Sequence, residues 1–143
     1  MYLYRIGNVI HRLKVPFVHH IFNLLIRLVH NCAVYSQTDI GKGTVFGYGG
    51  IGVVVHKRAQ IGKKCVIGSN VTIGGRSKSK GVPVIGDEVF IGTGAKILGE
   101  ITVGDNCVIG ANAVVISDVP ANSMVAGIPA KIIRTGIQAK DYY

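Results

Sequence analysis

Aliphatic residues recur along most of this chain with a period of six. The anchors of this period carry Val or Ile, and the gaps between them are six or twelve residues. They are Val55, Ile61, Ile67, Ile73, Ile85, Ile91, Ile97, Val103, Ile109 and Val115. A second, smaller apolar residue follows four positions after most anchors. These residues are Ala59, Cys65, Val71, Val89, Ala95, Ile101, Cys107, Ala113 and Val119. A half-buried strand alternates with a period of two, so a strict period of six predicts the face of a solenoid instead.

Glycine directly follows most of the anchors and predicts a corner there. Gly has no Cβ, so the chain can bend tightly at these positions. Six residues then form one short strand and one corner, and three such units close a triangular coil of about 18 residues. Successive coils stack at the usual strand spacing of roughly 4.8 Å. We therefore predict an all-β solenoid, with room for about five coils between residue 40 and about residue 133.

The repeat is interrupted at two places, and interruptions of a solenoid are where function can be placed. Between Phe46 and Val55, nine residues separate positions that should be six apart, so three extra residues should bulge outward. Residues 75–83 keep the count of six but place Ser79 where an aliphatic anchor belongs. This polar, basic and Gly-bounded stretch predicts a protruding loop. Tyr48 in the bulge and Arg76 in the loop are candidate substrate-binding residues.

Composition and charge narrow the class of protein. The chain has 143 residues, which suits one domain, with 20 Gly and only 7% aromatic residues. Its three cysteines are an odd number at wide spacing, which favours reduced thiols and a cytoplasmic location. Cys65 and Cys107 occupy the small inward slot and should be inert core thiols. The net charge of +9 indicates an anionic partner. No nucleic-acid-binding motif is present, so a phosphorylated cofactor or an anionic membrane surface explains the charge better than nucleic acid.

Residues 34–134 resemble the hexapeptide acyltransferases. The matching segments are VTIGG at 71–75, PVIG at 83–86, IGTGAKILG at 91–99, IGANAVV at 109–115, DVP at 118–120 and AGIPAK at 126–131. Within that family the chain is most similar to the serine acetyltransferase branch, including its relatives in polysaccharide clusters. The resemblance implies a left-handed parallel β-helix and a homotrimer with active sites between subunits. It also implies transfer of an acetyl group from acetyl-CoA to a hydroxyl.

The resemblance also suggests where the coenzyme lies. Gly75, Thr93 and Ala111 match family positions that line the coenzyme. They are spaced by 18, so in an 18-residue coil they would form one file along the axis. Small side chains there leave a groove for the pantetheine arm, although a tight coil also requires small corner residues. The candidates for the coenzyme phosphates are Lys78 and Lys96, also 18 apart, with Lys131 and Arg134 after the last coil. Each of these is equally consistent with a solvated surface charge.

Acetyl transfer to an alcohol requires a base that takes the hydroxyl proton, and His is the usual one. The chain has five histidines, and only His56 lies in the solenoid. It follows anchor Val55 in a slot where Gly is the rule, so its side chain should point outward. His56 is the candidate base, with a surface His as the alternative. Asp39 is a candidate orienting acid, 17 residues upstream, although the bulge between them disturbs the register. We expect no metal, because a zinc β-helix hydratase needs three His ligands.

The chain departs from the serine acetyltransferase pattern at the residues that matter for serine. Alignment puts the family's catalytic His near Tyr48, with Gly47 in place of the acid before it, and the partnering Asp at about Ala33. The loop residues that help to hold serine correspond to Gly81 and Val82. These differences favour a sugar hydroxyl, on a polysaccharide or its precursor, as the acceptor. Serine O-acetylation and a trimeric β-helix scaffold without catalysis are the alternatives.

Residues 1–33 lack the hexads and form a separate N-terminal segment. Pro16 divides it into 2–14 and 17–31, which we predict to be helices with broad apolar faces. The second helix, with Arg27 inside it, is too short and polar to span a bilayer. No acidic residue precedes Asp39, so these helices could lie on an anionic membrane surface, at the inner face of the cytoplasmic membrane. The alternative is that they pack on the trimer or cap the first coil. Residues 135–143 should form a C-terminal tail.

Overall fold

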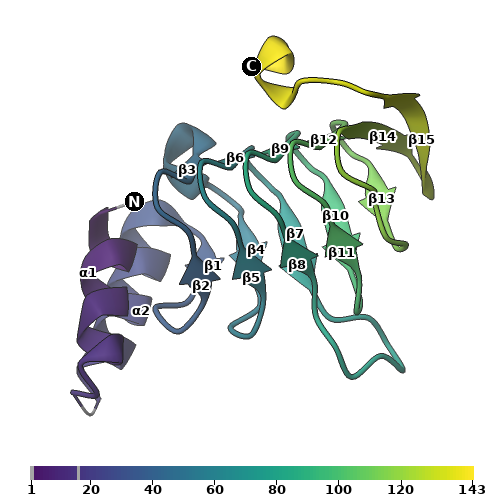
Figure 1. Ribbon diagram of the computed structural model, residues 1–143. Helices are drawn as coiled ribbons and strands as arrows, with labels where there is room; N and C mark the ends of the chain where they lie inside the picture. The colour runs from purple at the N-terminus through teal and green to yellow at the C-terminus, as the bar shows by residue number, and fades with distance from the viewer. Residues whose placement is uncertain (1, 16) are drawn as a thin grey trace.

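Short parallel strands stack coil upon coil into a left-handed β-helix, with two helices at its N-terminal end (Figure 1). The computed structural model describes residues 2–15 and 17–143. The helices are α1 (Tyr2–Arg12) and α2 (Val18–His30), as the sequence predicts. The predicted break at Pro16 lies outside the described residues. None of the described helices is long and apolar enough to cross a bilayer.

Three sheets form the sides of the solenoid. Sheet A contains β1 (Ala33–Val34), β4 (Val54–Val55), β7 (Thr72–Gly74), β10 (Lys96–Leu98) and β13 (Val114–Val115). Sheet B contains β2 (Asp39–Ile40), β5 (Gln60–Ile61), β8 (Val84–Ile85) and β11 (Thr102–Val103). Sheet C contains β3 (Val45–Phe46), β6 (Val66–Ile67), β9 (Phe90–Ile91), β12 (Val108–Ile109), β14 (Ser123–Gly127) and the antiparallel β15 (Ala130–Thr135). One strand of each sheet makes a coil, so the described residues form four complete coils. In the fifth, sheet B is reduced to the bridge between Val103 and Val119.

The predicted period of six identifies the core correctly. All ten anchors are between 0% and 4% exposed, and the smaller apolar slots are between 0% and 8% exposed. Glycine at the corners is required by the close approach of neighbouring coils. A Cβ at Gly62 would overlap the carbonyl of Gly86 in the next coil, and one at Gly104 would lie 2.5 Å from the amide nitrogen of Ala121. Tight corners and an aliphatic interior therefore come from the same hexad.

The two interruptions change the register between coils by different amounts. At the bulge, Val45 pairs with Val66, 21 residues ahead, which agrees with three extra residues. These residues include the 3-10 turn η1 (Gly47–Gly50). At the loop, Thr72 pairs with Lys96, 24 residues ahead, and not 18. The prediction that residues 75–83 keep the count is therefore wrong. The loop protrudes as expected, but it adds six residues to its coil.

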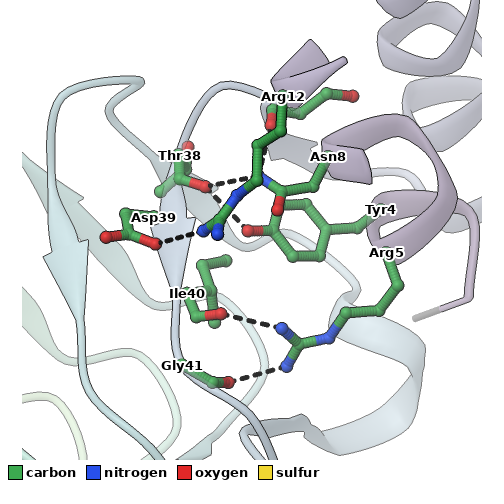
Figure 2. Close-up of polar contacts among 9 residues, drawn as sticks. Tyr4, Arg5, Asn8, Arg12, Thr38, Asp39, Ile40 and Gly41 are labelled. Atoms are coloured by element: carbon green, nitrogen blue, oxygen red, sulfur yellow. Dashed lines mark hydrogen bonds and ion pairs between the residues drawn. The ribbon is translucent and has the colours of Figure 1, made fainter. Parts of the chain in front are cut away.

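Helix α1 caps the open end of the first coil (Figure 2). That coil has no preceding coil, so α1 supplies the donors that its carbonyl groups need. The contacts run from Tyr4 Oη to Thr38 O (2.7 Å), from Arg5 to Ile40 O (2.7 Å) and Gly41 O (2.8 Å), and from Asn8 Nδ2 to Ser36 O (2.8 Å). At Gly7, a Cβ would overlap Ser36 Oγ, so glycine permits the close docking. The capping alternative is thus confirmed for α1.

The other end of the solenoid is closed by the chain turning back on itself. Strand β15 runs antiparallel to β14, and the C-terminal tail then returns along sheet C (Figure 1). The 3-10 turn η2 (Ala139–Tyr142) begins where Ala139 N donates to Asn106 Oδ1 at 2.7 Å. The rings of Phe90 and Tyr143 stack with their centroids 5.3 Å apart. The tail is therefore docked against the solenoid.

A matched pair of Tyr→Phe variants tests the N-terminal cap. Tyr4 is 1% exposed and hydrogen-bonded, whereas Tyr2 on the same helix is 89% exposed. Tyr4→Phe leaves the Thr38 carbonyl without its donor and should lower the free energy of unfolding by about 1–2 kcal/mol. Tyr2→Phe should leave it unchanged. Urea denaturation at a fixed protein concentration measures both, and equal effects of the two variants would contradict the cap.

The same pair has an alkaline signature. Burial raises the pKa of Tyr4 from 10.0 to about 12. The unfolded chain therefore releases this proton first, so the stability linked to Tyr4 is complete below pH 10 and is lost as the pH rises towards 12. Tyr4→Phe should lack this part of the alkaline loss, and Tyr2→Phe should retain it.

Candidate active site

The predicted site residues divide between two corners of the triangular solenoid. We call the corner between sheets A and B corner AB (residues 35–38, 56–59, 74–83 and 98–101). Corner CA joins sheets C and A (residues 47–53, 68–71, 92–95 and 110–113). Corner AB carries His56, Gly75, Arg76 and Lys78, and corner CA carries Tyr48, Thr93 and Ala111. The two groups leave the strands of sheet A at opposite ends, so they do not converge within one chain.

His56 lies half-buried at corner AB, directly after β4. Its backbone amide donates to Ile73 O at 2.8 Å, which holds it in the stack above β7. Its ring Nδ1 accepts a hydrogen bond from the amide of Arg58 at 3.1 Å. The neutral imidazole therefore carries its proton on Nε2 and donates from that atom. To accept a proton from a substrate, the ring must give up the contact with Arg58 or change its orientation.

Asp39 does not orient His56. The bulge adds three residues between the first two coils, so Val34 pairs with Val55 and Tyr35 occupies the position one coil before His56. Asp39 instead pairs with Gln60 in sheet B. Its carboxylate lies 2.9 Å from the guanidinium of Arg12 on α1, in an exposed ion pair (Figure 2). The candidate acid thus serves the cap, and no carboxylate hydrogen-bonds to His56 among the described residues.

The predicted coenzyme file is correct for two of its three members. Asn112 N donates to Thr93 O at 2.9 Å, so Thr93 and Ala111 are stacked neighbours at corner CA. One coil earlier, Gly94 N donates to Ser69 O at 2.9 Å, so Ser69 takes the place predicted for Gly75. Gly75 lies at corner AB, because the loop makes its coil six residues longer. The file at corner CA is therefore Ser69, Thr93 and Ala111. Ser69 was missed because a constant 18-residue coil was assumed.

Basic side chains flank this file, but not in the predicted arrangement. Lys78 lies exposed in the loop and does not stack on Lys96, which pairs with Thr72 and Val114. Lys96 Nζ donates to Asn70 O (2.9 Å) and Gly94 O (2.8 Å), both at corner CA.

At the far end of the file, β15 brings Lys131 opposite Ala126, one coil beyond Gly110. Arg134 lies farther along β15, opposite Met124, and both cations are exposed. Lys96 and Lys131 therefore remain candidates for an anion at corner CA, with Arg134 beyond them.

Known proteins share this fold and these segments. The family described as bacterial transferase hexapeptide (six repeats) matches residues 83–117. A serine acetyltransferase of Synechococcus elongatus is 35% identical over 138 residues, which cover 94% of this chain and 56% of that protein. The β-helix of this chain is a hexapeptide-repeat domain of the serine acetyltransferase-like branch. The chain spans just over half the length of this curated relative.

Solved structures of this branch superpose closely on the hexapeptide-repeat domain and its helices. A soybean serine acetyltransferase complexed with serine is 35% identical with a TM-score of 0.85, over 92% of this chain and 54% of that one. A serine acetyltransferase in complex with CoA is 33% identical with a TM-score of 0.82, also over 92% of this chain and 54% of that one.

A second imidazole lies beside the turn that carries Tyr48. Tyr48 has a left-handed backbone (φ 50°) and is 82% exposed. A Cβ built on the next residue, Gly49, would lie 3.5 Å from Nδ1 of His30, the last residue of α2. The docking of α2 thus brings His30 to corner CA of the hexapeptide-repeat domain. The periodicity could not reveal this contact, because His30 precedes the first strand.

Two hollows adjoin the candidate residues at corner AB. One of about 270 Å³ lies between α2 and β1, lined by His20, Asn23, Arg27, Tyr35 and their neighbours. Since Tyr35 is one coil before His56, this hollow leads toward that imidazole. The other, of about 160 Å³, is lined by Arg76, by Ser79 and by residues 98–101 and 116. Neither hollow has been given a substrate, and both contain groups that can hydrogen-bond to one.

The cysteines of the hexapeptide-repeat domain behave as core residues. Cys65 and Cys107 are fully buried, and burial raises the pKa of both thiols. Their sulfurs donate to the carbonyls of Gly86 (3.2 Å) and Pro120 (3.1 Å). Cys32 is also buried, with a pKa raised for the same reason. Low thiolate content makes all three poor nucleophiles, which confirms the prediction for Cys65 and Cys107.

Proposed function

We propose that this protein transfers an acetyl group from acetyl-CoA to a hydroxyl. The observation that supports this most is the file of Ser69, Thr93 and Ala111 at corner CA, with Lys96 and Lys131 beside it. Small side chains leave the outer surface of these coils open to an extended pantetheine arm, and the cations suit its phosphates. The similar fold of a serine acetyltransferase in complex with CoA adds support.

The reaction has one proton to place. The acceptor oxygen attacks the thioester carbonyl, a base takes the hydroxyl proton, and the carbon–sulfur bond breaks to release coenzyme A as the thiol. An imidazole suits this role at neutral pH. The sequence proposes His56 at corner AB, and the structure adds His30 at corner CA. These are the two imidazoles to be compared.

L-serine is the first candidate acceptor, because the relatives and solved structures named above are serine acetyltransferases. A sugar hydroxyl is the second candidate, and a specific departure favours it. Tyr48 stands near the position of the family's catalytic His, and Gly81 and Val82 stand where loop residues help to hold serine. A sugar needs hydrogen-bonding groups and space, which the hollows at corner AB offer.

We further propose a homotrimer, as the resemblance implies. On one chain, His56 and the coenzyme file lie at different corners. A parallel trimer that sets corner AB of one copy against corner CA of the next would bring both groups to one cleft. The acyl group, the acceptor and the base would then meet between subunits.

The first experiment measures release of free coenzyme A thiol from acetyl-CoA with L-serine and with a panel of sugar nucleotides and glycans. We expect acceptor-dependent release, with O-acetylated product seen by mass spectrometry. Release with serine alone assigns the serine activity, and release with a sugar alone assigns the sugar activity. Failure of every acceptor would count against the enzyme and for the scaffold.

A pair of variants tests the corrected coenzyme file. Ala111→Leu places a larger side chain in the file at corner CA and should raise the KM for acetyl-CoA by roughly tenfold or more. Gly75→Ala should leave it unchanged, because no atom lies within 4 Å of a Cβ built there. The opposite result would restore Gly75 to the file and contradict the register argument.

The two imidazoles are tested by His56→Ala and His30→Ala under saturating acetyl-CoA. Loss of the general base should lower kcat by about 10²–10⁴-fold and remove the acidic limb of the pH–rate profile. Loss of the other imidazole should change kcat only a few-fold and keep the profile. If both variants retain full activity and the same profile, neither histidine is the base.

A further inference from the structure

Helix α1 is amphipathic in the opposite sense to an ordinary surface helix. Its polar residues Tyr4, Arg5 and Asn8 face the first coil and bind its carbonyls (Figure 2). Its large apolar residues face away from the protein. They follow one another at helical spacing and are Tyr2 (89% exposed), Ile6 (50%), Val9 (55%) and Leu13 (70%). Capping the coil has used the polar face of α1, so the apolar face is left uncovered.

Helix α2 presents a second apolar stripe. Ile26 points into the core and is 0% exposed. The uncovered residues have the spacing of one helix face and are Ile21 (59% exposed), Leu24 (58%), Leu25 (38%), Leu28 (70%) and Val29 (65%). Phe17, between the helices, is 78% exposed. Uncovered apolar residues in such numbers mark an interaction surface.

The charge of this segment decides between the occupants. Residues 1–38 contain four Lys or Arg residues and no Asp or Glu. A second copy docked on this surface would bring four positive charges against four. An anionic lipid surface would bury the apolar stripes and neutralise the cations. Lys14 and Arg27 are exposed and take part in no ion pair in the described part of the chain.

We propose that α1 and α2 together form a docking surface for an anionic membrane, on which the helices lie in the plane of the headgroups. Both helices stand at one end of the solenoid (Figure 1). In the trimer proposed above, three parallel β-helices would present three such surfaces on the same side, and avidity would strengthen the binding. The surface of a single chain does not depend on that trimer or on the acetyltransferase activity.

Vesicle flotation tests the surface with the full chain. Wild-type protein should float with vesicles of phosphatidylglycerol and phosphatidylcholine, and much less with phosphatidylcholine alone. The double variant Leu13→Gln with Leu28→Gln should lower vesicle affinity by roughly tenfold or more. The matched control, Ile132→Gln with Ile133→Gln, changes two equally large and exposed residues on β15 and should bind as wild type. Lys14→Gln with Arg27→Gln should weaken binding to anionic vesicles only.

Two further readings make the result decisive. Thiol release measured on soluble acceptors without vesicles should be the same for wild type and for Leu13→Gln with Leu28→Gln, so loss of docking is distinguished from loss of activity. Light scattering reports the assembly without lipid. The proposal is overturned if wild type fails to float with anionic vesicles. It is equally overturned if wild type forms assemblies larger than a trimer that Leu13→Gln with Leu28→Gln dissolves, since a second copy would then cover the surface.

Discussion

Each coil of this solenoid is held to the next by parallel backbone hydrogen bonds, such as those from Gly41 N to Ile61 O and from Gly62 N to Ile85 O. These bonds keep the aliphatic anchors in vertical stacks and bring the corners so close that a side chain would collide there. A coil can therefore lengthen only by expelling residues at a corner. The bulge at 47–53 and the loop at 75–83 are such expulsions, and they supply Tyr48 and Arg76 to the outer surface.

The same bonding leaves both ends of the solenoid with unpaired backbone groups, and the two ends are closed differently. Strand β15 and the C-terminal tail close the far end with more backbone pairing. At the near end, α1 uses the side chains of Tyr4, Arg5 and Asn8. A helix that turns its polar face inward must turn its apolar face outward. The cap and the proposed membrane surface are thus two consequences of one orientation.

Corner geometry also separates the groups that the chemistry needs. The coenzyme file follows corner CA, whereas His56 and the loop lie at corner AB. The file depends on backbone stacking and is rigid, while the loop residues have few neighbours. This division suits an active site shared between subunits, with each copy contributing a rigid wall to one cleft and a protruding loop to another. The position of His30 beside Gly49 gives corner CA an imidazole that the hexads themselves do not carry.

The sequence by itself determined which residues are buried, where the corners fall, and that Cys65 and Cys107 are core thiols. The reason is that a period of six is a local pattern, repeated often enough to phase itself. Only the tertiary structure decided the register across the interruptions, because that depends on which strands bond, as Thr72 does with Lys96. This pairing replaces Gly75 by Ser69 in the coenzyme file. Likewise, the helices have no period in common with the coils, so only their docking shows that Asp39 meets Arg12 and that His30 meets the Tyr48 turn.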